Sequence, residues 1–140
     1  MVNRPIVLKK ISRSRHSISR LRDKGNVTIE RFKNDLDVQD IVLHNFQLAI
    51  QGCIDIGSHI ISDEGWGVAG SINEIFHILH DKGVINGDSA EKMASMVGFR
   101  NILIHEYEDI NLDIVYNILH RHLDDIDEYL LTVVNHFKLG

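Results

Sequence analysis

An arginine and a histidine five residues apart are the side chains in this sequence best suited to chemistry. They are Arg100 and His105, the first and sixth residues of the segment RNILIHEY. The arginine guanidinium is a fixed cation that binds phosphate through two parallel hydrogen bonds, and the imidazole of histidine exchanges protons near neutral pH. One group that moves protons beside another that stabilises negative charge suits cleavage of a phosphodiester bond.

The spacing alone leaves two interpretations of this pair open. Five residues correspond to about 140° around a helix, so a straight helix separates Arg100 from His105. The two side chains converge if the helix unwinds after about Leu103, or if two chains contribute to one site. An arginine and a histidine near a helix end are also ordinary C-terminal cations, which the helix dipole favours. The three aliphatic residues between them, 102–104, are expected in the core.

The other histidines and the single cysteine predict no metal site. Two histidine pairs occur, and neither has a further histidine, cysteine or carboxylate at a recognised metal-binding spacing. These pairs are His77 with His80 and His120 with His122. His59 is expected to be a buried or half-buried partner of a neighbouring carboxylate. Cys53 is the only cysteine, which excludes an intrachain disulfide and a cysteine-based zinc site. No glycine-rich phosphate loop is present, and no cofactor is expected.

The spacing of apolar residues predicts an all-α protein of about five helices without strands. The predicted helices cover about 4–22, 36–62, 71–82 and 111–133, with a short helical turn at 28–33. A further helix begins at 86–89 and runs into the segment GFRNILIHEYED. Short loops between amphipathic helices place consecutive helices side by side and antiparallel, which is typical of an up-and-down bundle. The length of 140 residues predicts a single domain, 1–140.

The segment 36–62 is expected to be the central helix, because apolar residues occur nearly all round it. Asn45, Gly52 and His59 share one face, and Gly52 would let another backbone approach closely. Asp55 in such a helix needs a hydrogen-bonded or charged partner. The apolar surface of this helix is too large for a five-helix monomer to cover, which predicts a symmetric homodimer.

The charge of the chain is divided between a basic start and an acidic body. Residues 1–33 hold ten basic and two acidic side chains, and residues 34–140 hold five basic and eighteen acidic ones. The first helix can therefore contact a phosphate backbone, or it can lie against the acidic body of its own fold or of a second copy. The apolar runs are too short for a membrane span and the N-terminus lacks a signal sequence, so a cytoplasmic protein with no membrane partner is expected.

The segment GFRNILIHEYEDIN resembles the Arg-x4-His-x-Tyr signature of the HepT-like toxins, a branch of the HEPN superfamily. LAIQGCIDIGSHIIS is similar to the central helix of that family, and SINEIFHILHDKGVI followed by MASMVGFRN resembles its third and fourth helices. The resemblance covers about residues 28–135. It divides the domain into a basic first helix, 1–27, and a family-like core, 28–136.

This resemblance implies a HEPN-like bundle that forms a homodimer, with the signature arginines and histidines of both chains at a cleft near the two-fold axis. The implied activity is metal-independent cleavage of RNA, with tRNA as the target proposed for relatives. The implied partner is an MntA-type nucleotidyltransferase antitoxin, which silences the toxin by AMP transfer in a type VII-like pair. On this chain Arg100 and His105 are then the catalytic pair, Asn101 orients them, and Tyr107 accepts AMP.

Two features depart from the family and two other functions stay open. Gln51 stands where the family often has an acidic residue, and the basic first helix differs from the usual family start. A non-catalytic HEPN dimer could use Arg100 and His105 as an anion site, to bind a nucleotide or regulate its partner nucleotidyltransferase. A helical interaction module without a ligand is the third alternative.

Overall fold

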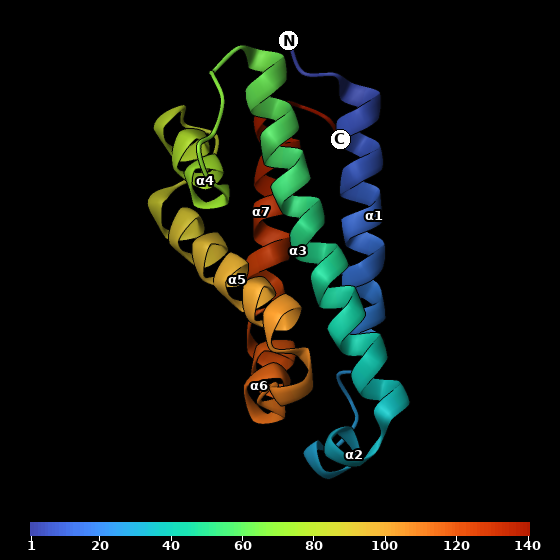
Figure 1. Ribbon diagram of the computed structural model, residues 1–140. Coiled ribbons are helices and arrows are strands. Elements are labelled where there is room, and N and C mark those ends of the chain that lie inside the picture. Colours follow the sequence, from blue (N-terminus) through green and yellow to red (C-terminus); the bar gives the residue numbers. More distant parts are fainter.

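The computed structural model describes all 140 residues as an up-and-down helical bundle without strands (Figure 1). Seven α-helices and one short 3-10 helix follow one another along the chain. They are α1 (Arg4–Asp23), α2 (Ile29–Asn34), α3 (Leu36–Glu64), α4 (Ile72–Asp81), α5 (Gly87–His105), η1 (Tyr107–Asp109), α6 (Leu112–Arg121) and α7 (Leu123–His136). The predicted all-α class is confirmed.

The longest helix, α3, runs through the centre of the molecule and packs against α1, α2, α4, α5 and α7. It begins where the Asp35 side chain accepts the backbone N–H of Val38, and it ends at Gly65, whose φ of 69° suits glycine. The predicted central position is therefore correct. The prediction that its apolar surface needs a second chain is wrong, because helices of the same chain cover all but Leu36 and Leu48.

Gly52 marks the closest approach between α3 and α1. A Cβ atom added at this glycine would lie 1.9 Å from the hydroxyl oxygen of Ser14, which is itself buried. The expected close approach at Gly52 is thus real, but the neighbour is the first helix of the same chain. Gly52 therefore gives no support to a dimer.

The predicted helix at 111–133 is in fact two helices, α6 and α7, which change direction at His122. Apolar residues continue at helical spacing through the junction, with Leu119 and Leu123 both buried. The break therefore leaves no trace in the periodicity. Its physical reason is packing: α6 lies against α2, whereas α7 lies against α5, α3 and α1.

The basic helix α1 is bound to the bundle by its apolar side and at its two ends. Arg22 forms ion pairs with Asp124 and Asp127 of α7. Arg4 donates to the backbone oxygen atoms of residues 137 and 138 near the C-terminus. The expectation that the basic helix lies against the acidic body is correct at the Arg22 end, whereas Arg4 meets only backbone oxygen atoms. The other cations of α1 have no acidic partner within the chain, since the ion pairs involve Arg22, Arg31, Lys33 and Lys92 among the arginines and lysines.

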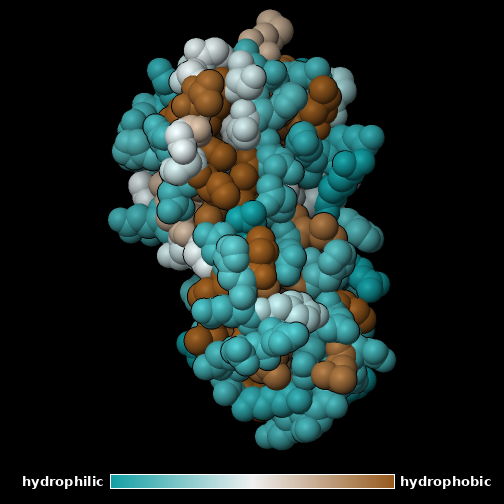
Figure 2. Space-filling model, in the orientation of Figure 1, coloured by the Kyte–Doolittle hydropathy of each residue, from teal (hydrophilic) through white to brown (hydrophobic).

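The face drawn in Figure 2 carries a hydrophobic patch in its upper half and is mostly hydrophilic at its lower end. Hydrophobic residues gather over α3 and α4 in the upper half of Figure 2, and the lower end around α2 and α6 is mostly hydrophilic. The 36 buried hydrophobic residues form one core. None of the helices combines the length and the hydropathy that crossing a membrane requires.

Candidate active site

The RNILIHEY segment forms the last turns of α5 and the start of η1. Leu103 is fully buried, and the ring of Phe99 packs edge-on against Phe46 of α3 at 5.1 Å between centroids. These contacts fix the end of α5 on the central helix. The α-helix continues through His105, and the N–H of Glu106 still donates to the backbone oxygen of Ile102 at 2.9 Å. The unwinding considered after Leu103 does not occur.

An unbroken helix places Arg100 and His105 on different sides of α5. Arg100 is half-buried, and its Nη1 atom donates to Oδ1 of Asn101 at 2.9 Å. His105 is exposed, and neither residue forms an ion pair. The two side chains are free to bind an anion, but one chain does not bring them together. Of the two routes to convergence, only a contribution from two chains is left.

The aliphatic residues between Arg100 and His105 are not all in the core, contrary to expectation. Leu103 is buried, but Ile102 and Ile104 are 45% and 46% exposed. Ile102 and Ile104 are therefore accessible for contact with another chain. A groove of about 550 Å³ lies elsewhere, between α1 and α3, and includes none of the signature residues.

Tyr107, the first residue of η1, is 45% exposed and its hydroxyl has one protein partner. The hydroxyl donates to Oδ1 of Asp40 in α3 at 2.8 Å. This hydrogen bond, together with slight burial and the charge of Asp40, raises the pKa of Tyr107 above its ordinary value. The phenol is therefore protonated at neutral pH, and its proton is held in the hydrogen bond to the carboxylate of Asp40.

The other two tyrosines are packed within the bundle. Tyr129 is fully buried and its hydroxyl donates to the backbone oxygen of Cys53 at 3.0 Å. Tyr116 is half-buried and its hydroxyl donates to the backbone oxygen of Val27 at 2.7 Å. Tyr107 is therefore the most exposed of the three tyrosines and the most accessible to a second protein.

Changing Asp40 to asparagine should lower the pKa of Tyr107 toward its ordinary value, because asparagine removes the charge that holds the phenolic proton. The raised pKa stabilises the fold while Tyr107 is protonated, and this contribution is lost as the pH rises through the folded-state pKa. Tyrosine ring carbon shifts followed by NMR from pH 8 to 12 measure the change, and Tyr107→Phe identifies the signal. Equal Tyr107 titration curves in both proteins would contradict the assignment.

The remaining candidate side chains have local partners. His59 is half-buried and lies 3.3 Å from Asp63, as expected. Asp55 has the hydrogen-bonded partner that it was predicted to need, since Nε2 of Gln51 donates to its Oδ1 at 2.9 Å. The histidine pairs at 77 and 80 and at 120 and 122 do not assemble a ligand set, because no three His, Cys, Asp or Glu side chains lie close enough to hold an ion.

Sequence reasoning missed Asp40. It lies 67 residues before Tyr107 and occupies an exposed position in α3, where an aspartate is ordinary. Only the packing of the α5 end against α3 brings the two together. No signal in the sequence pattern could have indicated this pair.

The chain is similar to known proteins over most of its length. Residues 14–133 match the model of the family described as Ribonuclease HepT-like. The chain is 32% identical over 126 residues to the mRNA nuclease HepT of Shewanella oneidensis, which covers 89% of this chain and 93% of that protein. It is 28% identical over 123 residues to the tRNA nuclease HepT of Aphanizomenon flos-aquae, which covers 83% of this chain and 84% of that protein.

A solved structure gives the same result for the fold. It is the tri-AMPylated HEPN toxin of Shewanella oneidensis in complex with MNT antitoxin. That toxin superimposes with a TM-score of 0.86 and 31% sequence identity, and the match covers 96% of this chain and 99% of the other. The HEPN-like bundle predicted from the sequence is therefore confirmed.

Proposed function

The chain belongs to the family of HepT-like ribonucleases, and from this premise we propose that it is the RNA-cleaving toxin of a toxin–antitoxin pair. Its catalytic residues are Arg100 and His105, Asn101 holds Arg100, and Tyr107 is the residue that a partner modifies. Residues 1–140 form a single domain that includes the basic first helix, because α1 buries its apolar side against α3 and α7.

The observation that carries this proposal is that the two signature side chains at the end of α5 are unpaired and lie on different sides of the helix. Arg100 and His105 have no acidic partner to neutralise them. Half-exposed isoleucines separate them in a helix that stays intact. A second copy of the chain that covers these isoleucines would bring its own signature beside the first. Each site would then use Arg100 of one chain and His105 of the other.

The chemistry follows from the properties of RNA. The 2′-hydroxyl attacks the adjacent phosphorus, a new O–P bond forms, and the bond to the 5′-oxygen breaks. His105 moves the proton between these oxygen atoms, and the guanidinium of Arg100 binds the extra negative charge of the pentacoordinate phosphorus. The products are a 2′,3′-cyclic phosphate and a 5′-hydroxyl. The substrate class is RNA, since the relatives named above are an mRNA nuclease and a tRNA nuclease.

The proposed partner is a nucleotidyltransferase antitoxin of the MntA type. The similar toxin of known structure is AMPylated and bound to an MNT antitoxin. Tyr107 supports the same arrangement here, because it is the exposed tyrosine and its hydroxyl is hydrogen-bonded to a carboxylate. AMP attached at Tyr107 would place a phosphate beside the signature cations and hinder RNA from entering.

Cleavage of RNA by the purified protein in excess EDTA tests the proposal. We expect cleavage at an unchanged rate, with 2′,3′-cyclic phosphate ends, because the mechanism takes its proton transfer and its positive charge from side chains. Loss of cleavage in EDTA with recovery on added Mg²⁺ would contradict metal independence. No cleavage in any buffer, together with binding of a nucleotide, would instead support the non-catalytic HEPN dimer.

A further inference from the structure

The basic residues of α1 separate into two sets with different surroundings. Arg4 and Arg22 lie on the side of the helix that faces α7 and the C-terminus, where both have partners. A second set follows at spacings of four, three and four residues, which places its members on one side of a helix. These residues are Lys9, Arg13, His16 and Arg20, and we call them the basic stripe.

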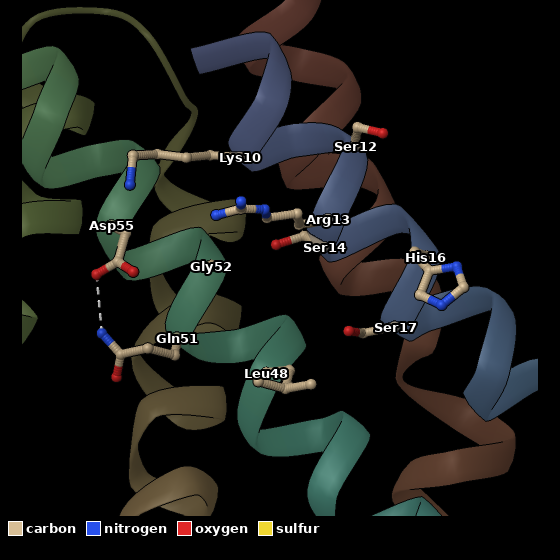
Figure 3. A pocket seen from close by; sticks show the side chains of 10 residues that line it. All are labelled: Lys10, Ser12, Arg13, Ser14, His16, Ser17, Leu48, Gln51, Gly52 and Asp55. Carbon is tan, nitrogen blue, oxygen red and sulfur yellow. Dashed lines mark hydrogen bonds between the residues drawn. The ribbon is translucent and has the colours of Figure 1, made fainter. Parts of the chain in front are cut away.

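The basic stripe borders the groove between α1 and α3. Arg13 and His16 line the groove together with Lys10, and the volume is about 550 Å³. Figure 3 shows Lys10, Arg13 and Ser14 pointing from α1 toward α3, with Gln51 and Asp55 on the facing helix. The close approach at Gly52 forms the floor, since the hydroxyl of Ser14 occupies the space that a Cβ atom would need.

The groove favours an anion. No member of the basic stripe forms an ion pair, although the body of the chain is strongly acidic. Asp55 is the single carboxylate in the lining, and it offsets one positive charge. The side-chain amide of Gln51 already donates a hydrogen bond to it. Lys10, Arg13 and the stripe residues outside the lining therefore leave an excess of positive charge along about 16 Å of helix.

The signature region lacks this excess. Four acidic side chains follow His105 within eight residues, at positions 106, 108, 109 and 113, and only the last is paired, with Lys33. A ribonuclease site in such surroundings repels the RNA chain on either side of the bond that it cuts. The cations that hold the substrate must therefore come from another part of the surface.

We propose that the basic stripe and the α1–α3 groove form a second RNA-binding site, which holds the phosphates of a single strand outside the cleavage site. The proposal rests on the proposed function in taking RNA as the ligand. A groove with cations along one wall suits a single-stranded phosphate backbone, and the exposed hydroxyl of Ser12 lies in the lining beside the cations.

Charge reversal at two neighbouring arginines of α1 tests this site. Arg13 lines the groove, whereas Arg15 is exposed about 200° away on the same helix and also lacks an ion pair. Arg13→Glu and Arg15→Glu change the net charge equally. Binding of a fully 2′-O-methylated RNA oligonucleotide is measured by fluorescence anisotropy at several salt concentrations. This RNA has no 2′-hydroxyl nucleophile, so binding is measured whether or not the protein cleaves RNA.

We expect Arg13→Glu to raise Kd by about tenfold and to reduce the slope of log K against log salt by about 0.7, the value for one lost phosphate contact on a single strand. Arg15→Glu should change Kd less than about twofold. Equal losses in both variants would show diffuse attraction and overturn the site. Unchanged RNA binding with a changed sedimentation of Arg13→Glu would assign the stripe to a protein interface and also overturn it.

The two proposals can fail separately. Selective loss of binding in Arg13→Glu in a protein that cleaves no RNA would support the groove and reject the catalytic function. Normal cleavage and normal RNA binding in Arg13→Glu would support the catalytic function and reject the groove as an RNA-binding site. Melting temperatures of both variants equal to that of the wild type would establish that the fold is intact.

Discussion

Replacing Arg100 or His105 by alanine is expected to abolish RNA cleavage and toxicity while leaving the thermal melt nearly unchanged. Loss of a general acid–base group typically costs about 10²- to 10⁴-fold in rate, and loss of a group that stabilises transition-state charge costs about 10²- to 10³-fold. Neither side chain forms an ion pair, and His105 is exposed. The change in unfolding free energy should therefore stay within about 0.5 kcal/mol.

The control for this prediction uses other cations at helix ends. Arg121 is the last residue of α6 and His136 is the last residue of α7, and both are exposed. Arg121→Ala and His136→Ala remove equivalent C-terminal cations without touching the signature. We expect both variants to cleave RNA as the wild type does. A large loss of melting temperature in Arg100→Ala or His105→Ala, or equal loss of cleavage in the controls, would assign these residues to structure.

Replacing Tyr107 by phenylalanine should give a toxin that still cleaves RNA but escapes silencing by its nucleotidyltransferase. AMP transfer joins the tyrosine oxygen to the α-phosphorus of ATP, releases pyrophosphate and gives up the phenolic proton. Phenylalanine keeps the ring and removes only the acceptor hydroxyl, with the loss of one exposed hydrogen bond to Asp40. Co-expression of toxin and nucleotidyltransferase, followed by peptide mass spectrometry and a growth assay, measures both effects.

The other tyrosines supply the controls for AMP transfer. Tyr116→Phe removes a half-buried hydroxyl bonded to the backbone, and it should leave modification and silencing unchanged. Tyr129 is 0% exposed, so no enzyme reaches its hydroxyl in the folded protein. Adducts found only at Tyr116 or Tyr129, or silencing of Tyr107→Phe equal to that of the wild type, would reject Tyr107 as the acceptor.

Much of the fold could be predicted from the sequence, because helix ends and amphipathic faces are local properties. Asn86 caps α5 through the N–H of Ser89, and Ser71 caps α4 through the N–H of Glu74, as their residue types indicate. The bend at His122 could not be predicted, since the apolar spacing continues across it. The bend depends on which neighbours α6 and α7 pack against, and that is a tertiary property.

The candidate site was predicted less completely than the fold. The Arg-x4-His-x-Tyr spacing indicated the residues, but it could not show whether α5 unwinds or continues to His105. It also placed Ile102 and Ile104 in the core, where hydrophobic residues are usual, although half of each is exposed. Hydropathy does not distinguish a core from a surface that another chain covers. For the same reason the apolar α3 wrongly suggested an uncovered face.

Tertiary contacts separate the basic residues of the first helix into paired and unpaired cations, which the sequence alone does not distinguish. The charge count treats Arg13 and Arg22 alike, but Arg22 faces acidic residues of α7 and Arg13 lines an open groove. The two alternatives formulated for this helix, internal pairing and contact with phosphate, therefore apply to different sides of it. Only the positions of α3 and α7 show which cations remain available to a ligand.

The measurement that tests the central claim most directly is complementation between two inactive chains. Arg100→Ala and His105→Ala are co-expressed with different tags, and the mixed dimer is isolated through both tags. If each site uses Arg100 of one chain and His105 of the other, the mixed dimer keeps one intact site and should cleave RNA at about half the wild-type rate. A doubly tagged dimer with no more activity than either single variant would contradict the claim.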